Sequence, residues 1–268
     1  NKGLIMGRGS GIDTKGSCFL SSVVCEFHNL SIHKKDIKVL DFGCGSGQLV
    51  SQLTSIGYST YGCDIEKGWE KPYNNNSNHN NLKIISLNPY KLPFPDEFFD
   101  FVISSSVMEH VHNKEEVFYE IKRVLKTGGR AIHCFPSKYY LPSEPHTQVP
   151  ILNYFLPNIP RLWLFLWATL KVRKKYGDDT QEKSMETAKV VEQNIEYCEK
   201  HLCYWKNSEY EKISKLIFGN YSWPMNLYIS YAKSSRITNI CKKLPFKKLS
   251  GFFICQFRMS LLILKKTN

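Results

Sequence analysis

The stretch VLDFGCGSGQLV, from Val39 to Val50, decides how this sequence is interpreted. A short apolar run ends at an acid, Asp41, and an apolar helical pattern begins after the turn. Between them Gly43, Gly45 and Gly47 fall on alternate positions. A strand, glycine turn and helix let the backbone approach a ligand closely and point helix N–H groups at it. Taken alone, the turn suits a phosphate site, an adenosine site of another chemistry, or only a tight connection.

The residues around the turn argue against a phosphate ligand. No Gly-Lys-Ser/Thr follows, which excludes a P-loop, and Gln48 stands where a dinucleotide fingerprint needs its third glycine. Asp41 would repel a pyrophosphate and suits a cationic ligand. Asp64, twenty-one residues after Gly43, is placed to accept hydrogen bonds from ribose hydroxyls, and Ile65 would lie against a base.

The apolar pattern predicts alternating strands and helices. Strands are expected over 37–43, 58–65, 82–87, 99–107 and 130–135, and helices over 17–32, 47–57 and 113–125, the last with Asn113 as its N-cap. This order predicts an α/β fold with a doubly wound, mostly parallel sheet of seven strands. Six prolines within 136–160 then break the rhythm, and 161–216 has a helical pattern. The alternating stretch 250–266 predicts an edge hairpin that returns to the sheet.

Four segments follow from this pattern: a lead-in and helix (1–36), a ligand-binding core (37–136), an irregular and helical insertion or lid (137–240), and a basic segment that returns to the sheet (241–268). Apolar and charged contents of 42% and 22% are those of a soluble globular protein. The net charge is +12, and residues 212–268 carry eleven Lys or Arg and no Asp or Glu. Such a segment suits an anionic substrate, a membrane surface or nucleic acid, or is a solvated basic face.

Nine cysteines are present without a C-x-x-C pair, so we expect reduced thiols and no metal. The first residues lack an apolar signal segment, and the apolar stretch 162–172 is too short to span a bilayer. We therefore expect a cytoplasmic protein. The amphipathic segment around 162–175, with its basic end, would allow peripheral membrane contact or would form a lid helix.

Four segments, in order and spacing, resemble the class I S-adenosylmethionine-dependent methyltransferases of the small-molecule branch. They are VLDFGCGSG, YGCDI, LPFPDEFFDFVISSSVMEHV and EIKRVLKTGGRAIHCFP, and they span 39–136. The resemblance implies a Rossmann-like methyltransferase fold with S-adenosylmethionine as cofactor and S-adenosylhomocysteine as product. It implies cofactor contacts at Asp41, Gly43, Gly45, Gly47, Asp64, Ile65, Asn88, Ser104 and Ser105. Asn88 stands where this branch usually has an acid near the adenine amine.

Two histidines are candidate catalytic residues. His110 follows the predicted fourth strand, where the methyl group should emerge, although it could equally pack against or cap the next helix. His146 follows the fifth strand in the segment SEPHTQVP, at the carboxyl edge where open α/β sheets bind ligands. Glu144, Tyr139 and Tyr140 are expected to bind the acceptor at the same edge.

The segment FPSK…EPH…VP resembles methyltransferases associated with bacterial surface-glycan pathways. O-methylation of a sugar or of a nucleotide- or phosphate-linked precursor of a surface polysaccharide is therefore the first functional expectation, and the basic tail would suit such an anionic acceptor. One alternative is a lipid-soluble acceptor such as a quinone precursor, and another is a non-catalytic cofactor-binding partner protein. The chain lacks the basic-aromatic interleaving of nucleic-acid modules, so no nucleic-acid partner is expected.

Overall fold

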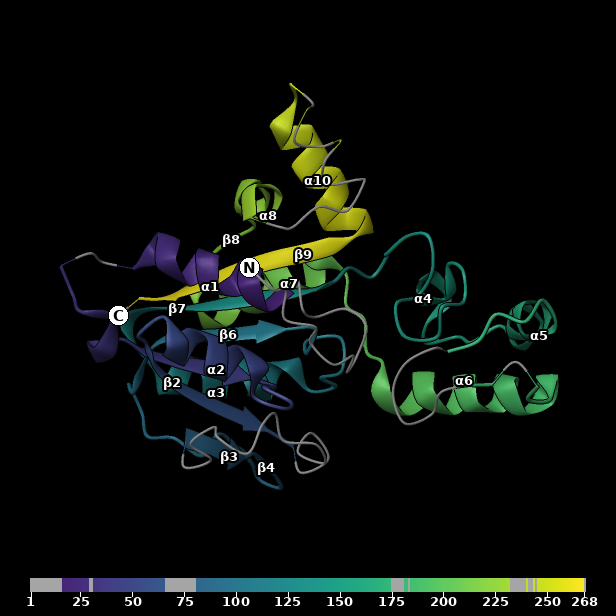
Figure 1. Ribbon diagram of the computed structural model, residues 1–268, viewed down its shortest axis with the longest axis horizontal. Coiled ribbons are helices and arrows are strands. Elements are labelled where there is room, and N and C mark those ends of the chain that lie inside the picture. The colour runs from purple at the N-terminus through teal and green to yellow at the C-terminus, as the bar shows by residue number, and fades with distance from the viewer. Residues whose placement is uncertain are drawn as a thin grey trace, which may run out of the picture.

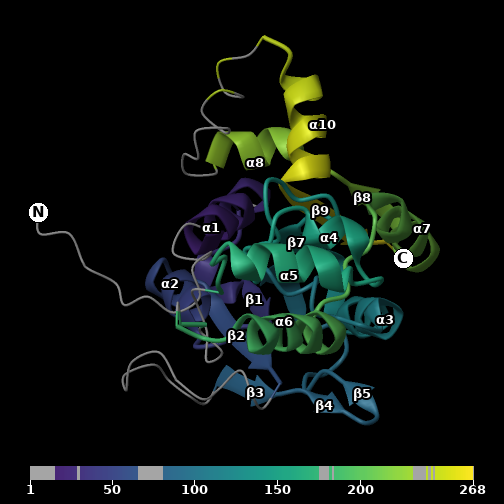
Figure 2. The same cartoon turned by 90° about the vertical axis from the view of Figure 1, so that its right-hand side faces the viewer.

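The computed structural model describes residues 16–28, 31–65, 81–174, 181–182, 184–231, 240, 243 and 245–267. The expected lead-in before residue 16 lies outside this part of the chain. The described residues form a seven-stranded sheet in the order β3-β2-β1-β6-β7-β9-β8, with helices on both faces (Figures 1 and 2). The predicted doubly wound α/β fold is confirmed.

The strands of the main sheet are β1 (Lys38–Phe42), β2 (Ser59–Asp64), β3 (Leu82–Ile84), β6 (Phe99–Ser105), β7 (Leu125–Pro136), β8 (Gly219–Ser222) and β9 (Met259–Lys266). Strands β4 (Ser86–Leu87) and β5 (Tyr90–Lys91) form a separate two-stranded sheet. The helices are α1 (Gly16–Phe27), η1 (Lys34–Asp36), α2 (Gln48–Ser55), α3 (Lys114–Val124), α4 (Leu152–Phe155), α5 (Arg161–Thr169), α6 (Thr187–His201), α7 (Asn207–Ile217), α8 (Met225–Tyr231) and α10 (Lys247–Phe257).

The strand order reverses beside β1, whose two neighbours β2 and β6 are both parallel to it. Open α/β sheets bind ligands at such a switch point, outside the carboxyl ends of the strands. The segment after β1 carries the glycine turn, and the segment after β6 carries His110. Topology therefore brings the two sequence motifs to the same edge of the sheet.

Two apolar cores cover the faces of the sheet. One core packs α1, α2, α8 and α10 against one face, and the other packs α3 and α7 against the opposite face. Asn113 caps α3, because its Oδ1 accepts a hydrogen bond from the Glu116 N–H at 3.4 Å. This N-cap is the one that the sequence predicts.

The C-terminal region corrects two expectations. Residues 247–257 form helix α10 instead of a strand, and β9 lies between β7 and β8, so the predicted edge hairpin is wrong. The four residues Leu261–Leu264 are all buried, as in a strand covered on both faces. The edge strand is β8, which the predicted insertion 137–240 had included, so the chain rejoins the sheet earlier than expected.

A separate unit lies beyond the carboxyl ends of the strands, at the right of Figure 1. We call it the cap: the irregular segment 137–151 and helices α4, α5 and α6. The cap has an apolar core of its own, which α5 and α6 share with residues near α4. Among the described helices, none combines the length and apolar character needed to cross a bilayer.

Candidate active site

The glycine turn after β1 has a backbone conformation that residues with a Cβ rarely adopt. Gly43, Gly45 and Gly47 have φ values of +74°, +48° and +78°, in the left-handed region that favours glycine. A Cβ on Gly43 would lie 2.3 Å from Cγ2 of Val107, whereas a Cβ on Gly45 would meet nothing within 4 Å. Gly43 therefore packs closely against the segment after β6, and the space beside Gly45 is open for a ligand.

Two carboxylates give this turn a negative potential. The Asp64 carboxylate accepts hydrogen bonds from the Gly45 N–H at 2.6 Å and the Ile65 N–H at 2.7 Å, and Asp41 is buried with 3% exposure. Burial raises the pKa of Asp64, although these two hydrogen bonds oppose the shift. Burial, Asp41 and Asp64 all raise the pKa of the Cys44 thiol, which stands inside the turn.

These residues fit S-adenosylmethionine. A carboxylate offers about four acceptor positions, so Asp64 keeps capacity for ribose hydroxyls beyond the two backbone donors that it holds. Asp41 and Asp64 would favour the cationic sulfonium and amino groups, and the open space at Gly45 admits a ligand. The contact with Ile65, which is 40% exposed, stays a prediction.

The remaining predicted cofactor residues lie in different surroundings. The Ser104 hydroxyl is fully buried and shares a hydrogen bond of 2.8 Å with His133 Nδ1, so it points into the core instead of toward a ligand. Ser105, next along β6, is half-buried. Asn88 is exposed in the turn of the separate β4–β5 hairpin, off the main sheet. Its adenine contact remains a prediction.

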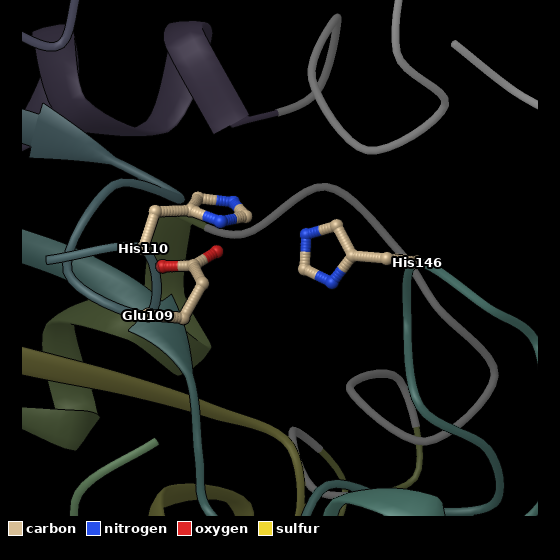
Figure 3. A group of neighbouring side chains, drawn as sticks. All are labelled: Glu109, His110 and His146. Atoms are coloured by element: carbon tan, nitrogen blue, oxygen red, sulfur yellow. The ribbon is translucent and has the colours of Figure 1, made fainter. Parts of the chain in front are cut away.

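The two candidate catalytic histidines meet across the boundary between the sheet and the cap. His110, from the segment after β6, and His146, from the cap, have ring centroids 4.9 Å apart in an edge-to-face arrangement (Figure 3). The Nδ1–H of His110 donates to the His201 carbonyl at the end of α6, at 2.7 Å. Burial and the neighbouring His146 lower the pKa of His110 to about 4, so its imidazole is neutral at physiological pH.

Glu144 is the centre of the hydrogen-bond network that holds His146. Its fully buried carboxylate accepts from His146 Nδ1 at 2.6 Å, Tyr204 Oη at 2.9 Å, the Thr147 N–H at 2.6 Å and the Thr147 hydroxyl at 2.9 Å. Burial favours the neutral form of both Glu144 and His146, but their attraction outweighs it, lowering the pKa of Glu144 and raising that of His146. The Glu144 carboxylate is therefore enclosed and orients His146, and its predicted contact with the acceptor stays a prediction.

The predicted acceptor residues Tyr139 and Tyr140 are half-buried and engaged elsewhere. The Tyr139 carbonyl accepts from Tyr154 Oη at 3.0 Å, and the two rings are 5.0 Å apart. The Tyr140 ring lies 4.5 Å below the Arg258 guanidinium. The first contact lies within the cap, and the second joins the cap to the α10–β9 connection. A role in acceptor binding stays a prediction for both tyrosines.

Sequence analysis missed two residues that hold this region together. Tyr204, sixty residues after Glu144, had no local signal beyond an aromatic-rich stretch. Lys114 is fully buried, and its ammonium donates to the Val111 carbonyl at 2.6 Å and the Cys203 carbonyl at 2.7 Å. Burial lowers the pKa of Lys114 to about 8. Lys114 thus connects the segment that carries His110 to the segment that carries Tyr204.

A cavity of about 410 Å³ lies beside this network. Tyr204 lines it together with His112, Trp205 and the buried Lys138. The Lys138 ammonium donates to the Leu156 carbonyl, and burial lowers its pKa. The cap therefore encloses both a polar network and space for part of a small molecule.

Residues 40–133 match the family model described as the methyltransferase domain. The matched interval runs from β1 to β7, contains the glycine turn, Asp64 and His110, and ends before the cap. The match, the fold and the acidic glycine turn agree on S-adenosylmethionine as the cofactor. We call residues 37–136, which contain the matched interval, the donor half.

Two relatives illustrate the breadth of the similarity. The chain is 30% identical over 118 residues to sterol 4-C-methyltransferase strm-1 of Caenorhabditis elegans, covering 42% of this chain and 35% of the relative. It is 28% identical over 125 residues to demethylmenaquinone methyltransferase of Corynebacterium kroppenstedtii, covering 47% and 53%. The chain thus spans about a third to a half of the length of these relatives.

A solved structure extends the comparison beyond the matched interval. Phosphoethanolamine N-methyltransferase 2 of Haemonchus contortus, in complex with phosphomonomethylethanolamine and S-adenosylhomocysteine, aligns with a TM-score of 0.50 at 14% identity. The alignment covers 97% of this chain and 54% of that one. This likeness concerns the fold.

Proposed function

We propose that this chain is an S-adenosylmethionine-dependent methyltransferase that methylates a hydroxyl group of a small molecule. The acceptor would be held where the cap meets the carboxyl edge of the sheet. The observation that carries this proposal is the contact between His110 and His146, whose ring centroids are 4.9 Å apart. His110 comes from the family-matched interval and His146 from the cap.

The donor half supplies cofactor binding. Asp64 would accept hydrogen bonds from the ribose, while Asp41 and the open left-handed turn at Gly45 would accommodate the cationic methionine part. When bound, S-adenosylmethionine supplies an electrophilic methyl group on a sulfonium sulfur. Holding the two reactants in line can remove about 7–11 kcal/mol of the barrier, so positioning is the main contribution of the protein.

The cap supplies the proton acceptor. In its neutral form His146 donates its Nδ1–H to Glu144, and its Nε2 then carries the lone pair that can receive a proton. The acceptor hydroxyl gives its proton to this Nε2 while its oxygen bonds to the methyl carbon and the carbon–sulfur bond breaks. The Nε2 of the neutral His110 is a second acceptor, which would hold another O–H or N–H of the same small molecule, because the reacting hydroxyl has a single proton. A general base of this kind contributes about 10²- to 10⁴-fold to the rate.

The position of two C-terminal lysines weakens the case for an anionic or sugar-linked acceptor. Lys265 pairs in register with Arg130, in the first half of β7, and Lys266 donates to the carbonyl of Leu125, the first residue of that strand. Both lysines therefore lie away from the carboxyl edge where His110 and His146 meet. The relatives also give no support for a sugar acceptor, since their names concern sterol and menaquinone chemistry.

The surface of α5 favours a second candidate, a lipid-soluble acceptor such as a quinone precursor. Leu162, Phe165, Leu166 and Leu170 are spaced along one side of this helix and are 87%, 54%, 46% and 59% exposed. An outward apolar stripe of this kind is typical of helices that rest on a membrane surface. Flotation with anionic vesicles tests this candidate: the wild type should float and a Leu162→Ser/Phe165→Ser variant should not. Equal recovery of both proteins in the soluble fraction would refute it.

Two measurements test the proposed function. Calorimetry with S-adenosylmethionine should show binding to one site, and labelled S-adenosylmethionine incubated with extracts of small molecules should yield a labelled methyl ether. His146→Asn should remove the product and preserve cofactor binding, whereas His33→Asn, at the exposed residue that precedes η1, should preserve both. Cofactor binding without product from any fraction would instead indicate the non-catalytic partner protein.

A further inference from the structure

We propose that Glu109, His110 and His146 form a binding site for one divalent transition-metal ion. Each of these residues offers a ligand atom, and the three atoms all lie within 4.8 Å of one another. Figure 3 shows Glu109 and His110 on one side and His146 facing them from the other. The site would go beyond the proposed function, which requires no metal.

The spacing of the ligands is close to that of a metal site. Three atoms no more than 4.8 Å apart have a common centre within about 2.8 Å of each, compared with about 2.0–2.2 Å for zinc bound by nitrogen and oxygen. Each ligand would therefore move inward by less than about 1 Å. Small rotations of the side chains can bring the three ligand atoms together, because His146 faces Glu109 and His110 from the opposite side.

The partners behind the two rings favour metal binding. Metal-binding histidines usually donate their other ring N–H to a carboxylate or a backbone carbonyl, which fixes the tautomer and the ring orientation. The Nδ1–H of His146 donates to Glu144 at 2.6 Å, and that of His110 donates to the His201 carbonyl at 2.7 Å. Each Nε2 atom is then available as a metal ligand. A carboxylate orients the His146 ring, and a backbone carbonyl orients the His110 ring.

The ligand types select the class of metal. Two imidazoles and one carboxylate suit zinc, iron, cobalt or nickel, whereas magnesium and calcium prefer sites made of oxygen ligands. Three protein ligands leave a position open for water or for an acceptor oxygen. Glu109 and Glu144, which are 1% and 0% exposed, also place two carboxylates beside the added positive charge.

Occupation of this site has a consequence for catalysis that rests on the proposed function. A metal ion on His146 Nε2 uses the lone pair that would otherwise receive the acceptor proton. We therefore expect metal-loaded protein to transfer methyl groups more slowly than metal-free protein. The binding of the metal itself does not depend on the proposed function.

The test is a titration of the chelator-treated full chain with Co²⁺, followed by its visible absorption. Seven free cysteines lie in the described residues, so the spectrum must separate nitrogen and oxygen ligands from thiolates. We expect one equivalent of Co²⁺ to give d–d bands without a thiolate-to-cobalt charge-transfer band. Zn²⁺ should displace it.

Substitutions identify the ligands. Glu109→Gln, His110→Asn and His146→Asn should each weaken Co²⁺ binding more than about 100-fold, and Glu144→Gln, which acts through His146, by about 10–100-fold. His112→Asn is the matched control for metal binding. His112 lies two residues from His110 and is exposed, and its ring shares a hydrogen bond with the Lys200 carbonyl. Retained S-adenosylmethionine affinity shows that a variant is folded.

Cobalt binding that is unchanged in the His110 and His146 variants, or that shows the thiolate band, would overturn the metal site. Methyl transfer by metal-free protein tests the proposed function separately. Loss of that transfer with an intact cobalt site would overturn the base role of His146 and leave the metal site standing.

Discussion

The donor half and the cap build their sites in different ways. In the donor half, the functional groups lie close together in sequence: the glycine turn and Asp64 fall within 22 residues, and Asp64 hydrogen-bonds Gly45 directly. In the cap, the network of Glu144 draws on Tyr204, sixty residues away, and His146 meets His110 from the sheet. A site of the first kind can be recognised as a motif, whereas a site of the second kind exists only after the chain has folded.

This difference predicts that the two halves can be damaged separately. Variants in the cap should lose methyl transfer and keep cofactor binding, and variants in the glycine turn should lose cofactor binding while the cap stays folded. The following changes test that separation in order of the expected effect.

The largest effect is expected for His146→Asn. Because His146 is the proposed proton acceptor, kcat should fall by about 10²- to 10⁴-fold. No contact between His146 and the cofactor is proposed. The Kd for S-adenosylmethionine should therefore stay within about threefold of the wild type, a change in binding free energy well under 1.4 kcal/mol. Initial rates with labelled cofactor and calorimetry measure the two quantities. A His146 variant that keeps wild-type turnover, as the control His33→Asn should, would rule out the base role.

Glu144→Ala should cost about 3–5 kcal/mol of unfolding free energy, because it removes one partner of a buried ion pair. His146, Thr147 and Tyr204 would all lose their common acceptor. Urea unfolding followed by fluorescence measures the loss. Glu196→Ala is the matched control: Glu196 pairs with Lys200 at the surface, and its removal should cost no more than about 0.5 kcal/mol. Equal losses for the two variants would show that the network does not stabilise the cap.

Lys114 should make stability depend on pH. Its folded pKa of about 8 lies below the ordinary 10.5, so the unfolded chain binds more protons between these values and stability should rise with pH across that window. The penalty of the buried charge is fully present below pH 8 and is lost by about pH 10.5. Its size is on the order of 3 kcal/mol. The difference in unfolding free energy between wild type and Lys114→Met, measured from pH 7 to 10.5, isolates this effect. A difference that does not change with pH would contradict it.

Asp64→Ala should weaken S-adenosylmethionine binding by about 10- to 100-fold, as expected for the loss of hydrogen bonds to a charged group. Calorimetry measures the change. The affinity of the cap site for Co²⁺ should stay unchanged, because Asp64 lies in the donor half. A simultaneous loss at the cap would mean that the two halves do not act as separate units.

The strands and the glycine turn of the donor half could be predicted from the sequence for physical reasons. Glycines that need positive φ, such as Gly43 packed against Val107, leave a recognisable spacing. Apolar runs likewise predicted strands such as β1 and β2. The edge hairpin failed because the apolar pattern of 250–257 suits α10 as well as a strand, and because Leu261–Leu264 are buried on both faces instead of alternating.

The cap site could be predicted only in part. The segment SEPH predicted His146 and Glu144 as neighbours at the carboxyl edge of the sheet, but it could not show which of them is enclosed. That distinction depends on burial: Glu144 is enclosed by Thr147 and Tyr204, and only the fold brings Tyr204 to it. Lys114 escaped notice for a related reason, since lysines in helices are usually exposed.

The central claim is that His110, from the donor half, and His146, from the cap, act on one acceptor molecule. A double-mutant cycle on kcat/KM tests it, using His110→Asn, His146→Asn and the variant that carries both substitutions. Residues that act as a unit are strongly non-additive, so the double variant should lose little more activity than the more damaged single variant. Losses that multiply, so that the double variant shows the product of the two single effects, would contradict a shared site.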